Sequence, residues 1–164
     1  MTFARLARWG LAVIAAHNAE EALTIPAWLP SRLHDLEARF GIRPPLSDPA
    51  SFYASVIAAT IVPAMWVLLA SRSAARSVGA YSILVLYGVF AANALVPHLV
   101  GAMMLGGYVP GLITAVALVI PCTIWLCRRA VIDHYASPRG MMVALVIAAM
   151  VYAPAVGVLL GALP

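Results

Sequence analysis

The sequence predicts an all-α protein, a polytopic bundle of about five transmembrane helices, and three observations support this fold class. The 164 residues are 64% hydrophobic and only 10% charged, with a mean hydropathy of +0.98. Soluble domains are about 45–50% apolar and about 25% charged, so a soluble core of this size could not bury so much apolar surface. Five apolar stretches are long enough to cross about 30 Å of hydrocarbon. The arginines also gather on one side of these stretches, as they do in membrane proteins.

A single membrane domain over residues 1–164 is expected from this length. The predicted spans cover approximately residues 6–27, 50–70, 78–100, 110–127 and 141–160.

The first span requires a decision between a signal peptide and a retained helix. Arg5 and Arg8 followed by Trp9–Ala16 resemble the charged and apolar regions of a signal peptide. No A-x-A cleavage pattern follows, and apolar residues resume after Glu21. We therefore expect a retained helix.

The later spans begin with residues typical of helix starts. Ser47-Asp48-Pro49 and Ser137-Pro138 each place a capping side chain just before a proline at the first helical position. Ser77 is expected to cap the third span, and Pro110 to begin the fourth.

The connection between the first two spans has an amphipathic helix pattern over approximately residues 30–40. Its apolar residues recur at i, i+4, i+7 and i+11, while charged residues take other positions. Pro30 is expected to open this helix and Gly41 to stop it. The helix would lie in the outer headgroup region or cover the bundle as a lid. The apolar residues are Leu29, Leu33, Leu36 and Phe40.

The arginine distribution predicts the orientation. With the N-terminus in the cytoplasm and the C-terminus outside, seven arginines lie inside and three outside, which fits the positive-inside rule for a multi-pass protein of the cell (inner) membrane. This also explains the net charge of +4 without nucleic acid, and no basic stripe with interleaved aromatic residues is present. The lipid bilayer is the expected partner. The inside arginines are Arg5, Arg8, Arg72, Arg76, Arg128, Arg129 and Arg139; those outside are Arg32, Arg39 and Arg43.

Three ionisable residues lie within the first span. His17, Glu20 and Glu21 are spaced at i, i+3 and i+4, so they share one broad helix face. A charged residue near the bilayer centre costs about 2.5–3.5 kcal/mol on insertion scales, so these residues must face the bundle interior. The third span supplies the polar residues Asn93 and His98, separated by Pro97.

A depth estimate predicts that these groups share one pocket. Glu21 and Asn93 each lie fifteen residues from the inner ends of their spans, about 22 Å up at 1.5 Å per residue. Thr114, near the outer start of the fourth span, reaches a similar level. The pocket is therefore expected in the outer half of the membrane.

Several functions are compatible with such a pocket. In a metal-dependent intramembrane enzyme, a divalent metal (zinc or iron) would bind the site and activate water for attack on a lipid-like or small apolar substrate. In a metal-free enzyme, glutamate and histidine would act as acid and base, and Asn93 would orient a ligand or bind substrate. A proton- or metal-ion-coupled transporter is also possible, although a five-helix transporter would be small unless it forms a homo-oligomer. The remaining alternative is a purely structural polar clamp between helices. The expected metal ligands are His17, Glu20, Glu21 and His98.

The motif His17-Asn18-Ala19-Glu20-Glu21 resembles the defining pattern of the HXXEE family of small polytopic membrane proteins. Asn93–His98, Tyr108–Thr114 and Pro121 resemble the second half of that family. The resemblance implies a set of site residues but no reaction, because the family is one of unknown function. With the resemblance, the expected substrate contacts are the two residues Tyr108 and Thr114.

Other polar residues are expected to have ordinary roles. His34, Asp133 and His134 are expected to be solvated, and Tyr87, Tyr152 and Cys122 to be packing residues. The five-residue spacing of Cys122 and Cys127 fits neither a CxxC redox pair nor a zinc knuckle.

Overall fold

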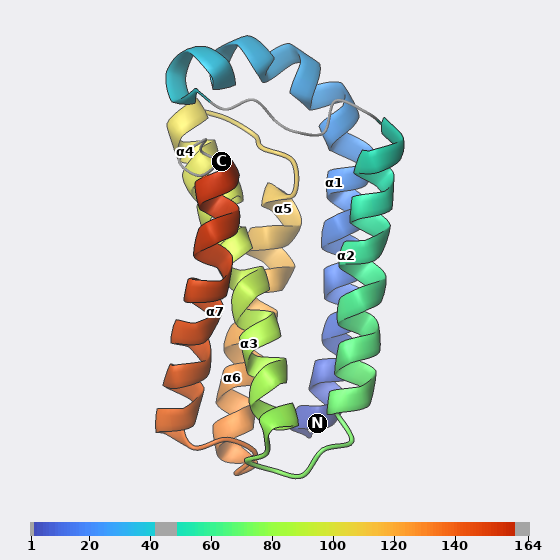
Figure 1. Cartoon of the computed structure of the whole chain (residues 1–164), viewed down its shortest axis with the longest axis vertical. Helices are drawn as coiled ribbons and strands as arrows, with labels where there is room; N and C mark the ends of the chain where they lie inside the picture. The colour runs from blue at the N-terminus through green and yellow to red at the C-terminus, as the bar shows by residue number, and fades with distance from the viewer. Residues whose placement is uncertain (1, 42–48, 160–164) are drawn as a thin grey trace.

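The computed structural model describes residues 2–41 and 49–159, with the side chains of residue 40 and of residues 155–159 left out. The described residues form helices joined by short turns, with no strand among them. The described elements group into five helical stretches, and Figure 1 shows that they lie side by side in a bundle. The capping residues Ser47 and Asp48, the loop arginine Arg43 and the expected end of the fifth span at residue 160 lie outside the described residues.

Each helical stretch corresponds to one predicted span, and two of the stretches change helix type along their length. The third stretch passes from α-helix into a π-helix and back, and the fourth does the same. The elements are α1 (Phe3–Phe40), α2 (Pro49–Ala70), α3 (Val78–Asn93) continued by η1 (Ala94–Val100) and α4 (Gly101–Leu105), α5 (Leu112–Thr114) continued by η2 (Ala115–Val119) and α6 (Ile120–Ile132), and α7 (Pro138–Leu159).

In the part of the chain that the structure describes, three helices are long and apolar enough to cross a membrane: Pro49–Ala70, Val78–Leu105 and Leu112–Ile132. Large apolar side chains cover their outer faces, for example Trp66, which is 53% exposed, and Leu69, which is 66% exposed. Soluble monomers rarely expose such continuous apolar surface, whereas lipid solvates it. The part of α7 whose side chains are described, Pro138–Pro154, is shorter, and α1 carries the polar cluster. The count of five spans and the orientation stay predictions.

The expected helix starts are largely confirmed. Ser77 accepts a hydrogen bond from the backbone N–H of Ala80, and Ser137 accepts one from Gly140, so both serines cap their helices. Pro49 is the first residue of α2. The fourth stretch, however, begins at Leu112 rather than Pro110, because Gly111 takes a left-handed conformation (φ 83°) as the N-cap.

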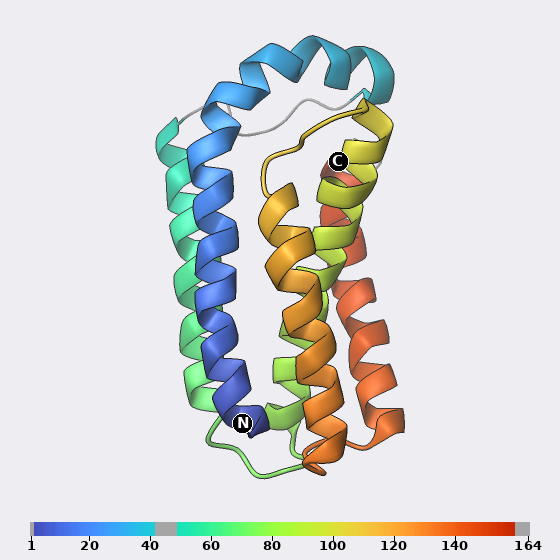
Figure 2. The same ribbon diagram turned by 180° about the vertical axis from the view of Figure 1, so that it is seen from behind.

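The prediction of a separate helix at residues 30–40 is wrong in one respect, because these residues continue α1. Pro26 and Pro30 lie inside the helix, which runs without interruption from Phe3 to Phe40 and ends, as predicted, at Gly41, which takes a left-handed conformation. Figures 1 and 2 show that this last part bends away from the upright part and crosses one end of the bundle. The two prolines explain the bend, because each removes a hydrogen bond and its ring clashes with the preceding turn. Leu36 is buried there, while Leu33 is exposed.

The opposite end of the bundle holds the main apolar core and a polar contact that the sequence did not predict. Asp133 is partly buried, accepts the backbone N–H of Phe3 at 2.8 Å and pairs with Arg129, so the expectation that it is solvated was wrong. A carboxylate at a helix N-terminus satisfies free N–H groups, and here it ties the start of α1 to the end of α6. His34 and His134 are exposed, as expected. The core includes Phe3, Leu6, Ile14, Val67, Ile83, Leu84, Tyr87 and Leu126.

Candidate metal centre

Two histidines and a glutamate from different helical stretches meet above the main core. His17 and Glu21 lie on α1, and His98 lies on η1. Glu21 Oε1 is 3.2 Å from His98 Nε2 and 3.9 Å from His17 Nε2. One ligand atom from each residue lies within 4.8 Å of the other two. Both histidines are buried, whereas the Glu21 side chain is 22% exposed, so Glu21 is the accessible member of the group.

Local helix geometry explains why these side chains converge. His17 and Glu21 are four residues apart on an α-helix and therefore neighbours on its surface. Asn93 and His98 are five apart, which on an α-helix would place them about 140° apart around the axis. The hydrogen bonds of a π-helix span five residues instead. The π-helical turn at Ala94–Val100 therefore brings Asn93 and His98 to one face, with Nδ2 and Nε2 3.1 Å apart.

Asn93 lies between the two imidazoles. Its amide nitrogen donates to His98 Nε2 at 3.1 Å and to His17 Nε2 at 3.4 Å. The hydroxyl of Tyr152 on α7 donates to the amide oxygen at 2.9 Å, which fixes the direction of the amide. Tyr152 was expected only to pack, so this contact extends the site to α7, a helix that the sequence did not associate with it.

A hydrogen bond at Nδ1 fixes the tautomer of His98. Nδ1 is 2.6 Å from the carbonyl oxygen of Pro110, which can only accept a hydrogen bond. Nδ1 therefore carries the proton, and in the neutral ring Nε2 presents a lone pair to Glu21 and Asn93.

His17 is oriented in the same way through Thr114. The hydroxyl of Thr114 donates its single hydrogen to Glu20 Oε2 at 2.6 Å, so its oxygen accepts from His17 Nδ1 at 2.9 Å. In the neutral ring, Nε2 of His17 therefore also carries a lone pair, on the side of Asn93 and Glu21.

Glu20 bonds to the start of the fourth stretch and is not a member of the group of possible ligands. Its carboxylate accepts the backbone N–H groups of Ile113 and Thr114, so it caps that helix from a neighbouring one. The hydroxyl of Tyr108 donates to the same carboxylate at 2.7 Å. Desolvation raises the pKa of the Tyr108 phenol above its ordinary value, and the neighbouring Glu20 acts in the same direction, so the phenol remains a donor.

Gly111 lets the two imidazoles approach the loop closely. A Cβ atom there would lie 2.6 Å from Cε1 of His98 and 3.0 Å from Cε1 of His17. Its φ of 83° also lies in the left-handed region, which side chains disfavour. Glycine is thus required on two independent grounds.

The comparison with protein families identifies the group to which this arrangement belongs. The profile of a family described as proteins of unknown function with an HXXEE motif matches residues 9–126. The chain belongs to the HXXEE family. The match contains His17, Glu20, Glu21, Asn93, His98, Tyr108 and Thr114, whereas Tyr152 lies beyond it. No curated protein and no solved structure matches the chain.

The HXXEE glutamates occupy different positions, although the sequence predicted both as metal ligands. Of the four predicted ligands, the structure brings together His17, Glu21 and His98. Glu20 instead bonds to Thr114, which separates it from this group. Thr114 and Tyr108, predicted as substrate contacts, both bond to Glu20. The roles of these residues in catalysis or substrate binding stay predictions.

The donor set of the HXXEE site fits a divalent metal. Ligands bound about 2.1 Å from one zinc ion lie about 3–4 Å from each other, close to the separations observed. The Glu21 carboxylate lies 3.2 Å from Nε2 of His98 and 3.9 Å from Nε2 of His17; in the neutral rings these nitrogens carry lone pairs and cannot donate to it, and no other described group donates to Glu21. Lone pairs 3.2 Å apart repel unless a cation or a proton lies between them. A hydrogen-bonded outer nitrogen on each metal-binding histidine is also typical of such sites.

Three contacts of the HXXEE site could not be predicted from the sequence. These are the Pro110 carbonyl, Gly111 and Tyr152. A turn glycine next to a proline gives no sign that imidazoles pack on it, and a tyrosine in an apolar helix usually packs. Asn18, the second residue of the motif, was not singled out either; it donates to Thr60 and so joins α1 to α2.

Proposed function

We propose that the chain is a metal-dependent intramembrane enzyme that acts on a lipid-like or small apolar substrate. The observation that supports this most strongly is the approach of the Glu21 carboxylate to two buried imidazoles, with one ligand atom of each residue within 4.8 Å of the other two. In this proposal His17, Glu21 and His98 hold a divalent ion such as zinc or iron. Bound there, the ion would supply Lewis acidity toward an oxygen of the substrate or of water.

The remaining residues of the site position these ligands and the substrate. Thr114 and Glu20 hold His17 in its tautomer, and the Pro110 carbonyl does the same for His98. Asn93, held by Tyr152, bridges the two imidazoles through its amide nitrogen and so orients these ligands. Tyr108 and Thr114 line the outer approach and contact the substrate.

A lipid-like substrate is favoured by the surroundings of the site. Apolar faces cover the outside of the helices that hold it, and the partly buried Glu21 is the most accessible of its three residues. The proposal includes five spans in the cell (inner) membrane with the N-terminus inside, which puts the site in the outer half.

One observation favours a different reading, a polar clamp with or without acid–base chemistry. The Asn93 amide already bridges both imidazoles, and a proton between Glu21 and His98 would relieve the repulsion as well as a metal would. In a clamp, Glu21→Gln lowers thermal stability and no metal is bound. A proton- or metal-ion-coupled transporter would instead show a pH-dependent ion flux in liposomes.

The proposal predicts a chemical change in membrane lipids or in apolar molecules dissolved in them. Purified protein in liposomes made from a total lipid extract is incubated with zinc or iron(II), and the lipids are compared by mass spectrometry. At least one species should be consumed by the wild type and by Arg139→Gln, which alters a distant exposed arginine. Glu21→Gln and His98→Ala should abolish the change. An identical lipid composition for wild type and Glu21→Gln with either metal contradicts an enzyme acting on these lipids.

A further inference from the structure

A long apolar groove lies on the lipid-facing side of the bundle, away from the metal centre. It has a volume of about 550 Å³ and runs between α3, α6 and α7. It exists because α7 packs mainly against α3 and barely touches α6. Ala91 lies on its α3 side, Ile124 and Cys127 on its α6 side, and Leu145 on its α7 side.

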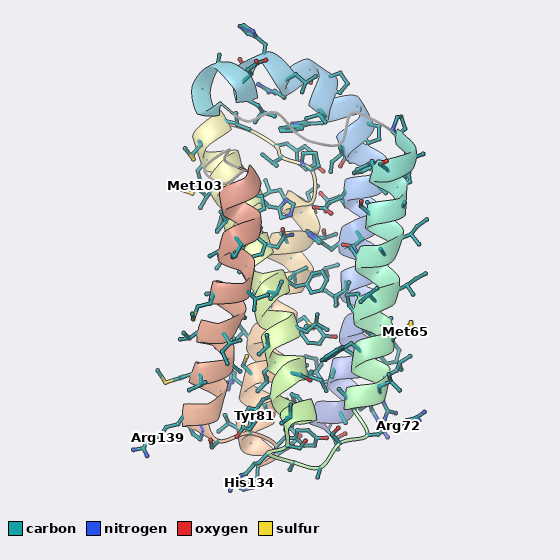
Figure 3. All side chains as sticks on the ribbon, viewed as in Figure 1. Met65, Arg72, Tyr81, Met103, His134 and Arg139 are labelled. Carbon is teal, nitrogen blue, oxygen red and sulfur yellow. The ribbon has the colours of Figure 1, made fainter. Side chains whose placement is uncertain are left out.

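The length and position of the groove match one leaflet of a bilayer. Its α6 side extends from Thr123 to Ile132, which is about 13 Å along the helix. Half of the roughly 30 Å hydrocarbon core is about 15 Å. It also lies at the arginine-rich end of the bundle, where Arg72, His134 and Arg139 project in Figure 3.

Of the described residues that line this groove, one is charged. Arg128 is exposed and borders the groove four residues before Ile132, about 6 Å along α6 from that end of the groove. Among the described residues, the neighbouring Arg129 pairs with Asp133, whereas no carboxylate pairs with Arg128. An unpaired guanidinium beside an apolar groove is complementary to a molecule with an anionic head and an apolar tail.

We propose that this groove binds an anionic phospholipid, with an acyl chain between α6 and α7 and the phosphate of the headgroup on Arg128. A second groove between α3 and α7 provides an internal comparison. It has a similar volume, about 470 Å³, and no charged residue lines it. It therefore accepts acyl chains without distinguishing headgroups. Binding in the first groove is independent of the metal centre.

Native mass spectrometry tests this directly. Protein in neutral detergent receives equal amounts of phosphatidylglycerol and phosphatidylcholine with identical acyl chains. The wild type is expected to retain phosphatidylglycerol about fivefold better, which corresponds to about 1 kcal/mol for one arginine at the membrane surface. Arg128→Gln should remove the preference. Arg139→Gln, which alters an exposed arginine that does not line the groove, should keep it.

A pair of groove-filling variants locates the lipid. Ala91→Phe places a ring in the first groove and should reduce retention of phosphatidylglycerol, whereas Val143→Phe fills the second groove and should leave the preference intact. Equal retention of the two lipids by the wild type would overturn the proposal. So would an equal loss of preference in Arg128→Gln and Arg139→Gln, or full retention in Ala91→Phe.

Discussion

Two adjacent glutamates take different partners because consecutive residues on an α-helix point about 100° apart. Glu21 faces the imidazoles, whereas Glu20 faces the start of the fourth stretch, where its carboxylate accepts two backbone N–H groups. Spacing alone predicted that His17, Glu20 and Glu21 share a broad face and that Asn93 and His98 lie at a similar depth. The separate positions of the two glutamates depend on where the fourth helix begins, which spacing does not determine.

The chain of contacts from Glu20 through Thr114 to His17 predicts a defined tautomer. In the wild type the neutral His17 ring should be protonated at Nδ1, because the Thr114 oxygen accepts from that nitrogen. Thr114→Val removes the acceptor and should give a mixture of tautomers, while Thr114→Ser preserves it. The measurement is the pair of imidazole ¹⁵N chemical shifts in metal-free protein. Thr114→Val should also bind metal with an affinity about 10–100-fold lower. A wild-type ring protonated at Nε2, or shifts unaltered by valine, would refute this account.

At the scale of elements, the sequence located the helices better than their irregularities. Apolar length identified the helical stretches, and Ser77 and Ser137 marked two of the starts. The π-helical turn at Ala94–Val100 was not predicted, although Pro97 within it indicates a disrupted helix. The continuity of α1 through Pro26 and Pro30 was also missed, because a proline pair usually predicts a helix boundary. Long-range packing decides both the π-helical turn and the continuity of α1, and the periodicity of apolar residues does not reveal long-range packing.

The turn before α5 gives a prediction about the site it supports. Gly111→Ala should displace both imidazoles and add about 1–2 kcal/mol of left-handed backbone strain. We expect a lower thermal unfolding temperature and loss of metal binding, measured by differential scanning fluorimetry and metal titration. Gly107→Ala is the matched control, since a Cβ atom there meets nothing within 4 Å. Equal behaviour of the two variants would show that the close approach at Gly111 is unimportant.

For the whole molecule, composition and arginine distribution predict a membrane bundle with one polar site. The three helices within residues 2–41 and 49–159 that are long and apolar enough to cross a membrane support the first part. The main apolar core lies at the arginine-rich end, and the polar site lies farther along α1. Neither composition nor charge indicates which helices pack together, so the contribution of α7 through Tyr152 could be seen only in the structure.

The predicted orientation can be tested with reporter fusions. A reporter joined after Arg43 should lie outside the cell, and one joined after Arg76 should lie in the cytoplasm. Alkaline phosphatase and a fluorescent protein, active on opposite sides, provide complementary readouts. Identical results for the two fusion points would mean that α2 does not cross the membrane, and reversed results would mean that the orientation is inverted.

Metal content tests the central claim most directly: His17, Glu21 and His98 form one divalent-metal site. Elemental analysis of protein purified without chelators should find about one zinc or iron per chain in the wild type. Glu21→Gln, His17→Ala and His98→Ala should each lose it, because every ligand of a three-residue site is needed, while Arg139→Gln should retain it. A wild-type protein that folds but binds no divalent metal, even after reconstitution, would contradict the account.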